Sequence, residues 1–180
     1  QYTAVCNAIE TVLVDRDIAS SFLPLLEKAL INAGVKINGS KDVAELINCN
    51  IIDGEDFRHE YLDKEISLKI VDSIEDAITH INFYGSHHTD CIITENTENR
   101  ELFFVRIDSA NVFCNCSTRF ADGYRFGFGA EVGISTAKMP PRGPVGLDGL
   151  VTYKYKLYGS GQTVASYCDG SKRFNFVDLM

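Results

Sequence analysis

The sequence predicts an α/β domain built around a mainly parallel, twisted sheet flanked by helices. Short β-branched segments alternate with segments whose apolar residues recur at helical spacing, and the connections between them are short. The length agrees with this class, because 180 residues are enough for one compact domain and would crowd two.

Local patterns place the individual elements. Asp17 is expected to cap the first helix and Gly34 to end it, while Ser73 followed by Asp76 is typical of a capping box. Gly85 is expected to turn the chain with a positive φ. The expected strands are 10–14, 35–37, 66–71, 90–94 and 110–114, and the expected helices are 17–33, 41–47, 74–84 and 98–107.

The last third of the chain has a different character. Residues 115–149 are rich in glycine and proline and show little periodicity. In a compact domain such a long irregular segment is more often functional than idle, so we expect it to bind a ligand. Residues 151–158 alternate apolar and polar side chains and are predicted to form a strand with one apolar face.

The charge pattern argues against two classes of partner. Lysine and arginine number 17 against 25 aspartates and glutamates, a formal net charge of -8. No basic run is present to neutralise phosphates, so we expect no nucleic-acid partner. No stretch approaches the roughly 20 apolar residues of a membrane span, and the first residues lack the order of a secretory signal. We therefore expect a soluble, cytoplasmic protein that binds no membrane.

Six cysteines are spread along the chain, and we expect reduced thiols because a domain of this size needs no disulfides. No Cys/His cluster has zinc spacing, so no metal site is predicted. Cys6 lies where the chain turns into regular structure, a position in which backbone donors can stabilise a thiolate. The alternative is that Cys6 is a small buried apolar residue, as free cysteines usually are.

Residues 71–92 carry the pattern V-x5-A-I-x-H-I-x2-Y-G-S-x-H-T-D-x-I. This pattern resembles the signature of gamma-glutamyl phosphate reductases, also called glutamate-5-semialdehyde dehydrogenases, at every specified position. Three further segments are similar to that family: V-C-N-A at 5–8, N-x-S-T-R-F at 115–120 and G-A-E-x-G-I-S-T at 129–136. His80 belongs to the signature, but its place between apolar residues of a helix predicts a structural role.

The resemblance implies the catalytic domain of an aldehyde dehydrogenase-like fold and a reaction. That reaction is the reduction of L-glutamate 5-phosphate by NADPH to L-glutamate 5-semialdehyde with release of phosphate, the second step of proline biosynthesis. The expected catalytic residues are Cys6 and Asn7, and Cys6 would be the nucleophile. An acyl phosphate already has a good leaving group and therefore needs a soft nucleophile. The Cys6 backbone N–H would help to stabilise the oxyanion.

The resemblance also assigns binding residues. Arg119 offers a planar fork for the substrate carboxylate, with an internal salt bridge as the alternative. Glu60 stands where the superfamily has a glutamate that holds the nicotinamide ribose, with a plain surface carboxylate as the alternative. The segment expected to bind substrate comprises Asn115, Ser117, Thr118, Arg119, Phe126 and Gly127.

By the same resemblance, residues 1–150 would be the cysteine-bearing domain and 151–180 an oligomerisation strand and tail. The N-terminal cofactor domain would be absent from this chain, so the isolated chain is expected to lack hydride transfer. A homo-oligomer is implied, and glutamate kinase would be a functional partner or a fused neighbour. The alternatives are another aldehyde or semialdehyde dehydrogenase, or a non-catalytic oligomerisation module.

Overall fold

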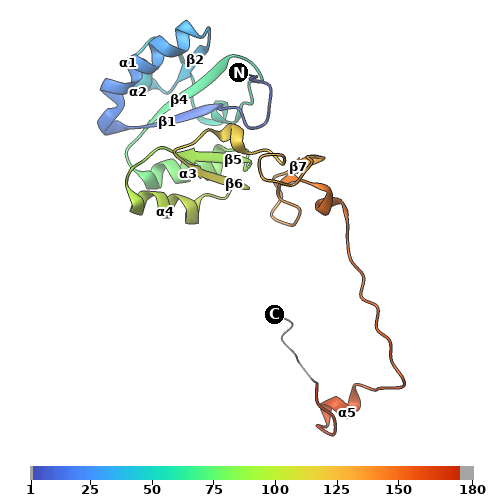
Figure 1. Ribbon diagram of the computed structural model, residues 1–180. Helices are drawn as coiled ribbons and strands as arrows, with labels where there is room; N and C mark the ends of the chain where they lie inside the picture. Colours follow the sequence, from blue (N-terminus) through green and yellow to red (C-terminus); the bar gives the residue numbers. More distant parts are fainter. Residues whose placement is uncertain (1, 175–180) are drawn as a thin grey trace. The chain divides into compact units, whose positions relative to one another are not determined.

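A computed structural model describes residues 2–174 of the chain (Figure 1). Contacts divide these residues into two units, one ending at Leu150 and the other beginning at Val151. The first unit is of the predicted α/β class, with parallel strands flanked by helices. No helix within residues 2–174 is long and apolar enough to cross a membrane.

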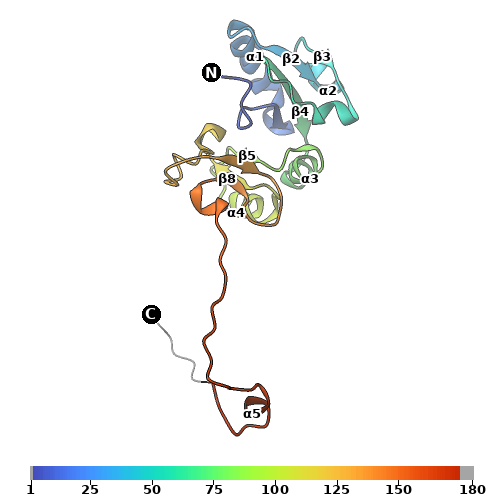
Figure 2. The same ribbon diagram turned by 90° about the vertical axis from the view of Figure 1, so that its right-hand side faces the viewer.

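A four-stranded parallel sheet forms the first layer, with the order β1 (Thr11–Asp15), β4 (Glu65–Val71), β2 (Lys36–Gly39) and β3 (Asn50–Ile51). Helices α1 (Arg16–Asn32) and α2 (Lys41–Ala44) connect its strands (Figures 1 and 2). Their apolar faces meet the sheet in a core that includes the fully buried Leu23, Val43 and Leu68. Burial of these side chains supplies much of the folding free energy of the layer.

A second parallel pair, β5 (Thr89–Ile92) with β6 (Asn111–Cys114), is separate from the first sheet. Helices α3 (Ile74–Tyr84) and α4 (Thr97–Arg106) pack around a small core of Ile78, Phe103 and Ile107. The sequence predicted one mainly parallel sheet, and the parallel strands of residues 2–174 instead form two. Strands β7 (Gly133–Ser135) and β8 (Gly143–Val145) add an antiparallel pair.

Several predicted ends are confirmed and others shift. The Ser73 side chain accepts a hydrogen bond from Asp76 N at 3.1 Å, so α3 begins where the capping pattern predicted. Helix α1 is capped by Asp15, whose carboxylate accepts from Asp17 N, and not by Asp17 itself. The helix expected over 41–47 ends at Ala44.

Within residues 151–174, the described part of the second unit, there is one short helix, α5 (Ala165–Cys168). The strand predicted over 151–158 does not form in this chain, because none of the described residues pairs with it (Figure 2). An extended segment becomes a strand only when a neighbour accepts and donates its backbone hydrogen bonds. Its apolar side chains are exposed, with Leu157 97% accessible.

Candidate active site

Cys6 lies in a turn that precedes β1. The Ala8 N–H donates to the Val5 carbonyl at 2.9 Å, which places Cys6 and Asn7 at the two central positions of the turn. The Cys6 side chain is exposed, whereas Asn7 is buried. The alternative that Cys6 is a buried apolar residue is therefore wrong, and the thiol faces outward from the unit.

Asn7 joins this turn to a segment more than a hundred residues away. Its Nδ2 donates to the Ala121 carbonyl at 2.9 Å, and its Oδ1 accepts from Arg119 Nη1. The Thr118 hydroxyl donates to the Asn7 carbonyl at 2.7 Å. Three hydrogen bonds thus hold the Cys6 turn against residues 118–121, the part of the chain in which the sequence predicted the substrate loop.

Arg119 is half-buried and does not form the internal salt bridge that was its alternative role, since no ion pair among residues 2–174 includes it. One Nη donates to Asn7, and its Nε is buried without a hydrogen-bond partner. A buried donor without a partner costs free energy, and a guanidinium has five N–H donors. Arg119 can therefore still donate to a further acceptor. The Ser117 hydroxyl accepts from Arg119 N at 3.2 Å and caps the 3₁₀ turn Thr118–Phe120.

The other loop residues lie in different surroundings. Asn115 has a left-handed backbone (φ 53°), and its side-chain amide makes two 2.8 Å hydrogen bonds to the backbone of Thr94. Phe126 packs edge-on against Phe113, with ring centroids 6.5 Å apart. Gly127 has φ 83°, a conformation that favours glycine. Asn115 is thus fully engaged, and the Phe126–Gly127 turn is shaped by its own backbone.

The electrostatic surroundings of Cys6 oppose a thiolate. Partial burial and, after it, the Glu131 carboxylate raise the pKa of the Cys6 thiol. The Cys6 backbone N–H lowers this pKa by less, and the smallest effects are those of Glu60, which raises it, and Arg119, which lowers it. Burial and, after it, the negative neighbours disfavour the anion, so the reactivity of Cys6 stays a prediction. Glu131 is fixed nearby by accepting from Gly123 N at 2.7 Å.

Glu10, to which the sequence analysis gave no role, lies near Glu60. Glu10 directly precedes β1, and its carbonyl accepts from Ser67 N at 2.8 Å. Burial and the nearby Glu60 carboxylate raise the pKa of Glu10 to about 7. Glu60 itself is exposed, and it acts on both Glu10 and Cys6. Only the spacing Cys6-x3-Glu10 could have indicated this residue, and spacing alone does not reveal burial.

Replacing Glu10 with glutamine is expected to stabilise the folded chain increasingly as the pH rises above about 4.5, and fully above about 7. The folded pKa lies above the reference value of 4.5, so the stability due to protonated Glu10 is fully present below about pH 4.5 and is lost as the pH rises through about 7. Because the group is partly solvated, we discount the full shift to a gain of about 1–2 kcal/mol for Glu10→Gln at pH 8. Urea denaturation at pH 4.5 and pH 8 measures this. Glu45→Gln is the control, and equal gains at both pH values would contradict the assignment.

The signature histidines are buried. His80 packs edge-on against Phe57 with centroids 5.1 Å apart, and burial and Lys69 lower its pKa to about 4. The Nδ1 of His88 lies 2.6 Å from the Thr89 hydroxyl, and burial lowers its pKa. Both rings are therefore neutral at pH 7, which fits structural roles.

No group of three or more His, Cys, Asp or Glu residues within 2–174 could hold a metal ion. Two surface pockets of about 450 and 340 Å³ lie next to the 3₁₀ turn Gly54–Arg58. Neither is lined by Cys6 or by the segment around Arg119. The exposed Cys6 thus lies outside both pockets.

The class of fold can be identified by comparison with known proteins. No family model matches the chain. The fold is similar to that of an acetylating aldehyde dehydrogenase from Geobacillus thermoglucosidasius, with a TM-score of 0.53 at 18% identity over 88% of this chain and 46% of that one. The first unit thus has an aldehyde dehydrogenase-like fold.

The particular relatives are gamma-glutamyl phosphate reductases. Gamma-glutamyl phosphate reductase 1 of Synechocystis is 58% identical over 180 residues, which is 99% of this chain and 42% of the relative. The crystal structure of the Thermotoga maritima gamma-glutamyl phosphate reductase matches with a TM-score of 0.85 and 42% identity over 91% of this chain and 40% of that one. The resemblance predicted from residues 71–92 is confirmed, and the chain spans about two fifths of the length of these relatives.

Proposed function

We propose that this chain is the nucleophile-bearing part of a gamma-glutamyl phosphate reductase that converts L-glutamate 5-phosphate to L-glutamate 5-semialdehyde and phosphate. The observation that carries the proposal is the set of three hydrogen bonds between Asn7 and residues 118–121. They hold the Cys6 turn beside the segment that contains Arg119, and Arg119 has donors that are not used within the chain. Similarity to relatives of that name supports the substrate.

In the first step, the Cys6 sulfur attacks the acyl carbon of the substrate. The bond from that carbon to the phosphate oxygen breaks, phosphate leaves and a thioester remains on Cys6. The thiol proton passes to one of the carboxylates that act on it, Glu131 or Glu60. The Cys6 backbone N–H would donate to the negative oxygen of the tetrahedral state.

The segment that contacts Asn7 would bind the substrate. Arg119, whose second Nη is not committed to Asn7, would bind the substrate's α-carboxylate, and Ser117 and Thr118 would supply hydroxyl groups. Asn115, Phe126 and Gly127 would shape the loop around the glutamyl chain.

A nicotinamide cofactor, proposed to be NADPH, would supply the hydride that reduces the thioester to the aldehyde. The exposed Glu60 carboxylate fits a cofactor ribose, because it accepts hydrogen bonds and lies close enough to act on the Cys6 thiol. The residues that would bind the rest of the cofactor are expected outside this chain. The isolated chain should therefore not transfer hydride.

The wider context is part of the same proposal. Residues 1–150 would be the cysteine-bearing domain, and residues 151–158 would pair with a second copy to form a homo-oligomer. A glutamate kinase, separate or fused, would supply the acyl phosphate. The location would be cytoplasmic.

The proposal is tested on the intact reductase that contains this chain, run in the oxidative direction. Reduction of NADP should require both L-glutamate 5-semialdehyde and phosphate. We expect kcat/KM to be at least about 10²-fold lower for succinic semialdehyde, which lacks the α-amino group and carries its carboxylate one carbon closer to the aldehyde than the position that Arg119 would bind. Equal rates with both aldehydes, or rates independent of phosphate, would favour another semialdehyde dehydrogenase. No reaction at all would favour a non-catalytic oligomerisation module.

A further inference from the structure

Two cysteines unrelated to the proposed reaction approach each other at the end of the second sheet. Strand β6 ends at Cys114, and Asn115 then adopts its left-handed conformation and donates from its N–H to the Ile92 carbonyl at 2.9 Å. This turn brings the next residue, Cys116, back toward β5. The Cys91 thiol donates to the Cys116 carbonyl at 3.1 Å.

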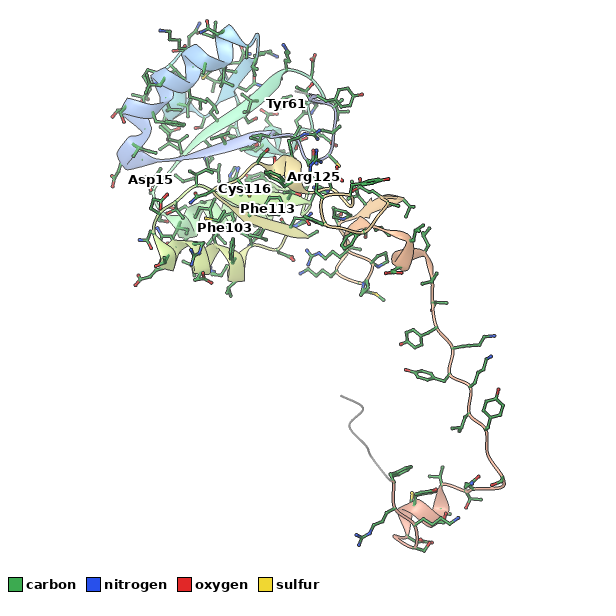
Figure 3. All side chains as sticks on the ribbon, in the orientation of Figure 1. Asp15, Tyr61, Phe103, Phe113, Cys116 and Arg125 are labelled. Carbon is green, nitrogen blue, oxygen red and sulfur yellow. The ribbon has the colours of Figure 1, made fainter. Side chains whose placement is uncertain are left out.

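The third cysteine in this region points elsewhere. Cys91 on β5 is paired in register with Phe113 on β6, and Ile92 is paired with Cys114. Successive residues of a strand point to opposite faces, so Cys114 lies on the face away from Phe113 and Cys91. Phe113 and Cys116 are labelled in Figure 3. Cys114 is therefore a matched control for the other two.

The two thiols have complementary accessibility. Cys116 is exposed, while Cys91 is half-buried, and all three thiols are free. Burial is the main cause that raises the pKa of Cys91, and the neighbouring Cys116 and Cys114 thiols raise it further. This arrangement is typical of a redox pair in which the accessible thiol reacts first with an external disulfide. The shielded thiol then attacks the mixed disulfide and resolves it.

We propose that Cys91 and Cys116 are a redox-active pair that closes to a disulfide when the chain meets a small-molecule disulfide such as oxidised glutathione. Cys116, as its thiolate, attacks one glutathione sulfur, forms a mixed disulfide and releases one glutathione thiolate. The Cys91 thiolate then attacks the Cys116 sulfur and displaces the second glutathione thiolate. The protons of the two cysteine thiols go to the released thiolates, the cysteines are oxidised and glutathione disulfide is reduced.

The bond would fix the segment that reaches the nucleophile turn. Only Ser117 separates Cys116 from Thr118, whose hydroxyl holds the Asn7 carbonyl. A covalent link from Cys116 to β5 restrains this segment and reduces its local opening. Redox state would thereby set the mobility of residues 115–121, independently of whether the proposed reaction occurs.

The test equilibrates the 180-residue chain over a range of glutathione redox ratios, alkylates the remaining thiols and maps the peptides by mass spectrometry. A cross-linked peptide joining Cys91 to Cys116 is expected in the natural chain and in Cys114→Ser, and in neither Cys91→Ser nor Cys116→Ser. Cys116→Ala is the second variant if the serine variant fails to fold. The proposal is overturned if Cys91 stays fully alkylated at every ratio, or if the cross-link is lost in Cys114→Ser.

Hydrogen exchange supplies the second readout. Oxidation is expected to slow amide exchange in residues 115–121 at least about threefold in the natural chain and in Cys114→Ser. No change is expected in Cys116→Ser. A cross-link that leaves exchange in this segment unaltered would overturn the inferred restraint.

Discussion

Cys6→Ser is expected to lower kcat of the intact reductase by at least about 10³-fold, because a serine hydroxyl without a dedicated base is a far weaker nucleophile than a thiol. The unfolding free energy should change by no more than about 0.5 kcal/mol, since the Cys6 side chain is exposed and the surrounding turn is held by backbone and Asn7 contacts. Steady-state kinetics and urea denaturation measure the two quantities. The variant should also form no thioester, which mass spectrometry of the acylated protein detects.

Cys168→Ser is the matched control, because Cys168 is another exposed free thiol but belongs to the second unit. It should retain full activity. If Cys6→Ser kept more than about a tenth of kcat, covalent catalysis by Cys6 would be ruled out.

Asn7→Ala is expected to act on both stability and catalysis. The side chain is buried, and its loss leaves the buried Ala121 carbonyl and the Arg119 guanidinium without a partner. An unsatisfied buried group costs about 1–3 kcal/mol, so we expect a loss of about 2–4 kcal/mol in unfolding free energy. A displaced nucleophile turn should lower kcat of the intact reductase by about 10–100-fold.

The aspartate variant separates positioning from folding. Asn7→Asp keeps an acceptor for Arg119 but cannot donate to Ala121, and it adds a negative charge beside Cys6. It should therefore fold better than Asn7→Ala and still shift the pH dependence of Cys6 alkylation to higher pH. The exposed Asn32→Ala is the control. An alkylation profile for Asn7→Asp that matches the natural chain would show that Asn7 does not position the thiol.

The parts of the fold that the sequence predicted are those encoded locally. Helix α3 begins at its Ser73 cap because the capping hydrogen bond spans only three residues. Strand β3 was missed because Asn50–Ile51 is too short to show a pattern. The division into two sheets depends on which distant strands pair, and no local signal records that choice.

Gly85 shows how a correct position can have a wrong explanation. The residue does end α3, but its φ is -67° rather than positive. A Cβ there would lie 2.6 Å from the Ile81 carbonyl oxygen, so close packing requires the glycine. The left-handed residue of this turn is His87, with φ 61°.

The sequence could propose residues for the candidate site but could not predict the electrostatic surroundings of Cys6. Resemblance to a family brought Cys6 and Arg119 into one hypothesis, and the hydrogen bonds of Asn7 place their segments together. Glu131 and Glu60, which raise the pKa of the thiol, are distant from Cys6 in sequence. Charge effects of this kind arise only after folding has brought the groups together.

The long sequence separation between Asn7 and Ala121 has a kinetic consequence. A contact that closes a loop of over a hundred residues forms late, because the chain loses the corresponding entropy before the contact stabilises it. During synthesis, the turn that holds the sulfur has no anchor until the ribosome has released the segment beyond residue 121. Refolding in the test tube should likewise regain helix and sheet before the thiol reaches its final environment.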